Sequence, residues 1–140
     1  MLQQTSTLRD ELISCDNPVK WLNVVTRVAK RYGFTYCTLM VMPKPSDHFF
    51  SQLVSTTNLP NKLIQGLDKF SLLKHCPLYA TFSHSIQPQV WNIADFDTQD
   101  ANMAMIVEAL RETNIDSGIL FSFSTINGER YIMRFDGSKM

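Results

Sequence analysis

Residues 118–135 read GILFSFSTINGERYIMRF, two runs of alternating residues on either side of Ile126-Asn127-Gly128. The length of the loop decides the fold of this hairpin, because a shift of one residue moves every side chain to the other face. A two-residue Asn127-Gly128 turn would place Phe121 opposite Arg134 and give two mixed faces. A three-residue loop with Gly128 in the left-handed conformation separates the faces. We predict this second register.

The predicted register gives the hairpin one apolar face and one half-polar face. The apolar face is expected to pack on a layer of helices, and it consists of Ile119, Phe121, Phe123, Tyr131, Met133 and Phe135. The half-polar face consists of Leu120, Ser122, Ser124, Arg130, Ile132 and Arg134. Antiparallel sheets often have one solvated face, so the neighbour of this half-polar face is either water or a bound molecule.

The first half of the chain predicts a helix followed by two strands. Asn17 as the cap and Pro18 at the first position begin the helix, and Gly33 ends it. The run 34–42 is apolar on both sides, which is typical of a central strand. The run 48–56 predicts a second strand, antiparallel to the first because the link between them is short.

The second half predicts helices around one more short strand. Asn58 and Pro60 begin a helix with leucines at i, i+4 and i+8, and a short extended piece follows around IQPQVWN. The run 97–114 predicts an amphipathic helix that ends at Asn114 in the role of a glycine. Its inward side chains are Met103, Ile106, Val107 and Leu110. Together these elements predict an α+β fold, a three-layer α-β-α sandwich around a five-stranded antiparallel sheet.

Length and composition are those of one ordinary globular domain. The chain has 140 residues, 44% hydrophobic and 19% charged, and no formal net charge. Without a basic excess, no nucleic-acid contact is expected. Three cysteines without C-x-x-C spacing favour a reducing cytoplasm. The N-terminal residues are too polar for a signal peptide, and no stretch has the length of a membrane span.

No catalytic pattern is present in the sequence. The three histidines, His48, His75 and His84, show no metal-ligand spacing, and the chain contains no G-x-S-x-G, P-loop or G-x-G-x-x-G motif. Cys76 follows His75 directly, but adjacent residues of a regular element point in different directions, so we interpret it as a buried structural cysteine. We therefore predict no enzyme, metal or cofactor, and expect a module for small-molecule binding or dimerisation.

Four stretches resemble the autoinducer-binding domain of LuxR-type quorum-sensing regulators, which has a GAF/PAS-like fold. They are YGFTYCTLMVMPKPS, VSTTNLPNKL, HCPLY followed by QVWN, and IVEALRETNIDSGILFSFSTINGERYIMRF. The T-N-x-P step at 57–60, Pro77, Trp91 and Ser117-Gly118 follow in family order. The resemblance implies one such domain over residues 1–140 and a chamber for an N-acyl-homoserine lactone between the sheet and the helices. The implied ligand-binding residues are Tyr36, Leu39, Leu59, Leu63, Leu67, Cys76, Trp91, Leu120, Ser122, Ile132 and Arg134.

The chain departs from the family at the polar groups that hold the lactone. Leu59, Leu63 and Leu67 stand where the family usually has a tyrosine, a tryptophan that donates to the lactone carbonyl, and another tyrosine. Cys76 stands in place of the aspartate that accepts the ligand amide hydrogen. Each lost partner costs about 1–3 kcal/mol, so the departures predict weak binding of the usual signal. Trp91 is the remaining member of the polar clamp.

Arg134 occupies a position where the family usually has a small hydroxyl or aliphatic residue. One interpretation is that it binds a ligand that bears a carboxylate. The other is that it reaches solvent or pairs with a local acid such as Asp136. The leucine stripe has two interpretations as well, since it either enlarges the chamber or lets it close.

Two functions from different classes remain open. The first is a sensing domain for an acyl-homoserine lactone or a related molecule, in which ligand occupancy is coupled to folding or dimerisation. The second rests on the expectation that this chain has no helix-turn-helix domain. A short homologue of this kind would form a homodimer, or act as a ligand-independent anti-activator in a heterodimer with a full-length LuxR-type regulator.

Overall fold

The computed structural model describes residue 11 and the ranges 18–83 and 85–138. Within these described residues, three helices and five strands form the framework, with short 3₁₀ turns between them. The helices are α2 (Pro18–Arg31), α3 (Asn61–Lys69) and α4 (Ala101–Glu112). The strands are β1 (Phe34–Val41), β2 (Val54–Thr57), β3 (Gln89–Asn92), β4 (Ser117–Ser124) and β5 (Arg130–Gly137). The 3₁₀ turns are η1 (Phe50–Gln52), η2 (Leu72–His75), η3 (Ala80–Ser83) and η4 (Ile93–Asp95).

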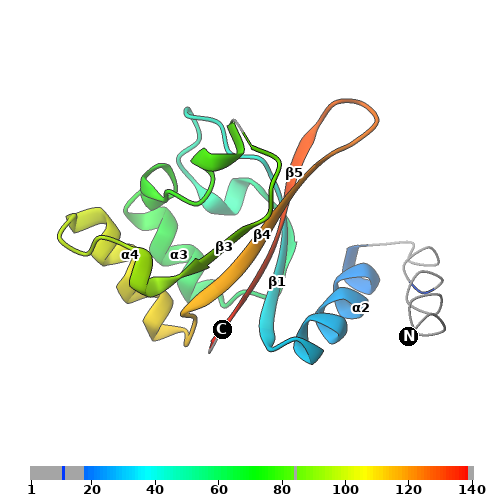
Figure 1. Cartoon of the computed structure of the whole chain (residues 1–140), viewed down its shortest axis with the longest axis horizontal. Helices are drawn as coiled ribbons and strands as arrows, with labels where there is room; N and C mark the ends of the chain where they lie inside the picture. Colours follow the sequence, from blue (N-terminus) through cyan, green and yellow to red (C-terminus); the bar gives the residue numbers. More distant parts are fainter. Residues whose placement is uncertain (1–10, 12–17, 84, 139–140) are drawn as a thin grey trace.

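The five strands form one antiparallel sheet in the order β2-β1-β5-β4-β3. Helix α2 packs on β1 and β2 and lies on one side of the sheet, while α3 and α4 lie on the other side (Figure 1). The predicted three-layer α+β sandwich around a five-stranded antiparallel sheet is confirmed.

The hairpin of β4 and β5 has the predicted register. Leu120 pairs with Arg134, and Phe121 pairs with Met133. The backbone N–H of Thr125 donates to the carbonyl of Glu129 (2.8 Å), which closes a three-residue loop. Gly128 has a φ of +84°, the left-handed conformation that a glycine adopts without strain.

The two hairpin faces differ in burial from what the residue pattern alone indicates. The half-polar face, called the inner face from here on, packs on the layer of α3 and α4, and its Leu120, Ile132 and Arg134 are buried. The apolar face, the outer face, is covered by α2 only in part. Phe121 and Phe123 on the outer face are 37% and 43% exposed. A face that pattern alone marks as polar becomes core when its polar groups find partners inside the protein.

Most other predicted elements are present. Gly33 ends α2 with a φ of +90°, and Asn114 ends α4 with a φ of +60°. The four side chains expected on the inward face of α4 are all buried. Asn17, predicted to cap α2, lies outside the described residues.

Two details of the predicted elements are wrong. The second strand is shorter than predicted, because residues 50–52 form the 3₁₀ turn η1, which buries the Phe50 ring, and only Val54–Thr57 pairs with β1. Helix α4 begins at Ala101 rather than at residue 97, because the Asp100 carboxylate caps it by accepting from the N–H groups of Asn102 and Met103.

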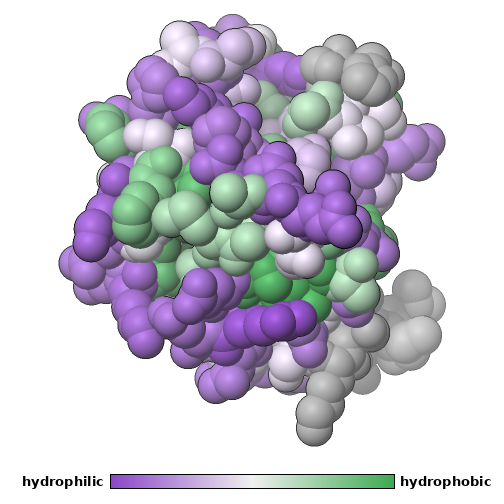
Figure 2. Space-filling model, turned by 90° about the vertical axis from the view of Figure 1, so that its left-hand side faces the viewer, coloured by the Kyte–Doolittle hydropathy of each residue, from purple (hydrophilic) through white to green (hydrophobic). Residues whose placement is uncertain are grey.

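The surface on the side of α4 carries apolar side chains near its middle, surrounded by polar ones (Figure 2). This agrees with the half-buried Met105 and Ala109 of α4. In the described part of the chain, no helix is long and apolar enough to span a bilayer.

Candidate functional site

A small, largely enclosed cavity lies between the inner face of the sheet and the helices, and we call it the central chamber. Its volume is about 30 Å³. It is lined by Phe50, Leu67, Leu72, Leu73, Cys76, Leu78, Tyr79, Phe96, Ile106, Leu110 and Arg134. A ligand pocket usually measures about 300–1,000 Å³, so the central chamber has room for a water molecule or two but not for a signal molecule.

Arg134 is the charged residue in the lining of the central chamber. Its Nε and Nη2 atoms donate to the two carboxylate oxygens of Asp136 at 2.8 and 2.6 Å. Its Nη1 atom donates to the hydroxyl of Tyr79 at 2.6 Å. The guanidinium also lies 5.9 Å from the centre of the Phe50 ring, within the range of a cation–π contact. Arg134 is 5% exposed and Asp136 is fully buried, so this is a bidentate ion pair away from solvent.

Burial and the ion pair together shift the pKa values of the groups in and around the central chamber. Burial lowers the pKa of the Arg134 guanidinium, but Asp136 and Tyr79 outweigh this effect and raise its pKa above the ordinary value. Burial raises the pKa values of the Tyr79 hydroxyl and the Cys76 thiol. A thiol with a raised pKa is a poor nucleophile, which fits a structural role for Cys76.

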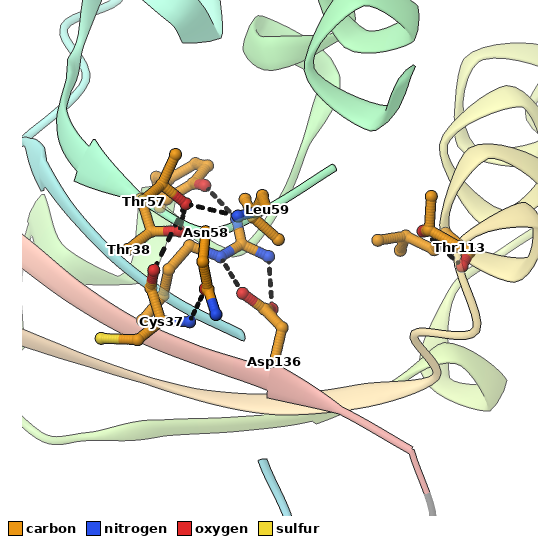
Figure 3. Close-up of polar contacts among 10 residues, drawn as sticks. Cys37, Thr38, Thr57, Asn58, Leu59, Thr113 and Asp136 are labelled. Carbon is orange, nitrogen blue, oxygen red and sulfur yellow. Dashed lines mark hydrogen bonds and ion pairs between the residues drawn. The ribbon is translucent and has the colours of Figure 1, made fainter. Parts of the chain in front are cut away.

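The T-N-x-P step joins β2 to α3 through side-chain hydrogen bonds (Figure 3). The Asn58 side chain accepts from the backbone N–H of Cys37 at 2.8 Å and donates to the carbonyl of Thr35 at 3.2 Å. The Thr57 hydroxyl accepts from the N–H of Leu59 at 3.0 Å. In this chain the motif holds the segment that leads into α3 against β1 through hydrogen bonds.

The structure brings most of the predicted ligand-binding residues to the inner side of the sheet. Three of them, Leu67, Cys76 and Arg134, line the central chamber. Leu59, Leu63, Trp91, Leu120 and Ile132 are buried in the surrounding core, and Tyr36 packs against that core. Ser122 is half-buried on the inner face, where it pairs with Ile132. Their role in binding a ligand stays a prediction.

The prediction that Leu39 lines the chamber is corrected, because Leu39 lies on the outer face of the sheet. It pairs with Met133 of the outer face, while its neighbours Thr38 and Met40 are fully buried on the inner side. Strand 34–42 is apolar on both sides, so its sequence does not reveal which residues face the chamber. For Arg134, the pairing with Asp136 is confirmed, whereas the expectation that this side chain reaches solvent is wrong.

Sequence reasoning missed several residues of the central chamber. Tyr79 and Phe50 belong to irregular segments around the 3₁₀ turns, where no helical or strand period marks an inward position. For Asp136 the signal was its position two residues after Arg134. Side chains alternate along a strand, so residues i and i+2 point to the same face. That spacing places Arg134 and Asp136 side by side.

Trp91 is buried in the core between Phe96 and Gly118. Its ring stacks on Phe96 with centroids 5.6 Å apart, and it pairs with Gly118 of β4. A Cβ at residue 118 would lie 2.6 Å from the Trp91 Nε1 atom, so glycine is required there. The buried Nε1–H has no acceptor among the described residues.

A larger open cleft adjoins the central chamber. Its volume is about 470 Å³, and its walls are the β1–β2 loop, the segment from η2 to η3, and the start of β5. Leu73, Cys76 and Tyr79 line both spaces. These three side chains therefore form the partition between the cleft and the chamber. We call this space the cationic cleft, after Lys44, Lys74 and Arg130 in its walls.

The chain is thus an α+β domain with a small chamber under the inner face of its antiparallel sheet. The sequence profile of the autoinducer binding domain matches residues 17–135. The chain belongs to this family, so the resemblance to the autoinducer-binding domain of LuxR-type regulators is confirmed.

Solved structures of LuxR-type regulators share the fold. The N-acylhomoserine lactone-dependent transcription factor CepR2 of Burkholderia cenocepacia has a TM-score of 0.78 and 16% identity, covering 99% of this chain and 79% of that chain. SdiA of Escherichia coli has a TM-score of 0.73 and 15% identity, covering 99% of this chain and 56% of that chain. A complex of SdiA with octanoyl-rac-glycerol has a TM-score of 0.68 and 16% identity, covering 95% of this chain and 54% of that chain. No curated protein matches the sequence.

Proposed function

We propose that this domain senses a small amphipathic signal in the cytoplasm for a LuxR-type regulatory system. The supporting observation is the position of the central chamber, between the inner face and the layer of α3 and α4, where the family resemblance puts the ligand. The structural relatives bind molecules with an acyl chain, since CepR2 depends on an N-acylhomoserine lactone and SdiA holds octanoyl-rac-glycerol.

The pocket is atypical, because Arg134 and its partners take up the polar end of the chamber. A typical lactone must displace a buried ion pair before it can enter. Breaking such a pair costs about 3–5 kcal/mol. The signal is therefore a molecule that either replaces these interactions or binds beside them in the cationic cleft.

Thermal unfolding tests the proposal. The purified chain is heated alone, with acyl-homoserine lactones of several chain lengths, and with octanoyl-rac-glycerol. A ligand at a hundred times its Kd stabilises the folded state by about 2.7 kcal/mol. Leu67→Phe narrows the central chamber and should reduce the shift, while Leu39→Phe on the outer face is the matched control. If no compound raises the Tm, the sensing role is wrong.

A second candidate function is ligand-independent interaction with another LuxR-type chain. Two observations favour it: the central chamber is too small for a signal molecule, and several apolar side chains of the outer face are exposed among the described residues. Val41, Val90, Phe121 and Phe123 are between 37% and 67% exposed there. Contiguous exposed apolar area of this kind is typical of interaction sites.

Association measurements separate the two candidates. Sedimentation and pull-down with a full-length LuxR-type regulator should detect a homodimer or heterodimer without added ligand if the second function holds. Phe123→Ser should weaken that association, and Val19→Ser, which changes an even more exposed apolar residue on α2, should not. A monomer that binds no regulator would exclude the second candidate.

A further inference from the structure

The cationic cleft has the size and lining of a ligand site. Its volume of about 470 Å³ falls within the range of small-molecule pockets. The buried side chains of Leu73 and Phe82, together with the half-buried Met42, provide apolar wall area. The aromatic ring of Tyr79 contributes to the wall that adjoins the central chamber.

Positive charge dominates the edge of this cleft. Lys44 belongs to the β1–β2 loop and Lys74 to η2, both are exposed, and neither has an ion pair within the described ranges. Arg130 donates from Nη2 to the carbonyl of Phe82 at 3.1 Å and has further N–H groups. The single carboxylate in the lining, Asp47, accepts from the backbone N–H of Lys44 at 2.7 Å.

We propose that the cationic cleft binds a single-chain amphiphile with an anionic head group, of the class of medium-chain fatty acids. The carboxylate lies between Lys44 and Lys74 near Arg130, and the alkyl chain lies on Leu73, Phe82 and Met42. This inference rests on the proposed sensing function and names its ligand class. It needs no change in the Arg134–Asp136 pair, because the ligand stays on the outer side of the partition.

The partition couples a ligand in the cleft to the centre of the domain. Tyr79 contributes to the cleft wall, and its hydroxyl accepts from Arg134 at 2.6 Å. A bound chain that presses on the Tyr79 ring acts on the buried ion pair and, through it, on β5. Occupancy of an outer site thus affects the core of the sheet.

Binding by the full chain is measured with three probes that share a ten-carbon chain: decanoate, decanol and decanoyl-homoserine lactone. All are used below their micelle concentrations, in calorimetry and thermal unfolding. The test variant is Lys44→Glu/Lys74→Glu. The matched control is Lys30→Glu/Lys69→Glu, which reverses two charges outside the cleft lining. Vesicles of phosphatidylglycerol test whether the same lysines prefer a membrane surface.

Decanoate is expected to bind at least tenfold more tightly than decanol, and the difference should shrink with added salt. The test variant should lose at least tenfold in decanoate affinity and the control less than twofold. Equal affinities for decanoate and decanol, or equal losses in both variants, overturn the inference. If only the lactone binds, the fatty-acid inference is overturned and the sensing function stands. If no probe binds, the inference and the sensing function are both overturned. If the chain binds the vesicles but not decanoate, the fatty-acid proposal is wrong and the lysines bind a membrane surface.

Discussion

Replacing Asp136 with asparagine should be strongly destabilising. The substitution keeps the shape of the side chain but removes the charge that receives two hydrogen bonds from Arg134, at 2.8 and 2.6 Å. A hydrogen bond to a charged group contributes about 1.5–3 kcal/mol, and loss of one partner from a buried ion pair costs about 3–5 kcal/mol. Both estimates give a loss of about 3–5 kcal/mol in the free energy of unfolding.

Urea-induced unfolding followed by tryptophan fluorescence measures this loss. For a domain of this size, each kcal/mol lowers the Tm by about 3 °C, so the variant should melt about 10–15 °C below the wild type. The matched control is Lys62→Met, which removes the exposed Lys62–Glu112 ion pair of 3.5 Å between α3 and α4. Exposed pairs contribute about 0–1 kcal/mol, so the control should stay close to the wild type.

A double variant distinguishes an ion-pair effect from a general defect in packing. Arg134→Met/Asp136→Asn removes both charges, and replacing a buried pair with uncharged groups is often neutral or stabilising. The double variant should therefore recover most of the stability that Asp136→Asn loses. If Asp136→Asn alone costs less than about 1 kcal/mol, the pair is solvated and the central chamber is not closed as described.

Three further substitutions test the structure around the site. The buried Cys37 thiol has its pKa raised to about 12 by burial and by Asp136, while the unfolded thiol ionises near its ordinary pKa of about 8.5. Stability should therefore fall with rising pH in this window, by about 1.4 kcal/mol per unit, and unfolding at pH 8–10 should show a shallower fall in Cys37→Ala. Gly118→Ala should lower the free energy of unfolding by about 3 kcal/mol, because the added Cβ would lie 2.6 Å from Trp91 Nε1. A melting curve unchanged from wild type would contradict this contact. Asn58→Ala leaves the N–H of Cys37 without its acceptor and should cost about 1–3 kcal/mol in urea unfolding, and Asn58→Asp, which keeps the acceptor, should cost less.

The sequence predicted the hairpin well because its geometry is local. Only one loop length separates the apolar from the polar residues of 118–135, and Gly128 provides the conformation that this loop needs. Helix α4 was predicted for a similar reason, since its inward side chains repeat at helical spacing. These features depend on residues that are near neighbours in the sequence.

The chamber could not be predicted in the same way, because burial depends on partners that are distant in sequence. Arg134 is buried because Asp136 neutralises it and Tyr79, 55 residues away, accepts its remaining hydrogen bond. Hydrophobic patterning treats an arginine as a surface residue unless such partners are known. The same limit explains why the residue pattern alone left the neighbour of the inner face open.

The buried ion pair changes what family membership implies for ligand affinity. A lactone that enters the central chamber must separate Arg134 from Asp136, at a cost of about 3–5 kcal/mol. This cost weakens the Kd by about two to three and a half orders of magnitude. A site with intrinsic micromolar affinity would then bind its lactone only at near-millimolar concentration. A ligand in the cationic cleft avoids this cost, because the partition of Leu73, Cys76 and Tyr79 lets the pair remain intact. A chamber of this size therefore predicts weak lactone binding, and the ligand proposed for the cationic cleft would bind without separating the pair.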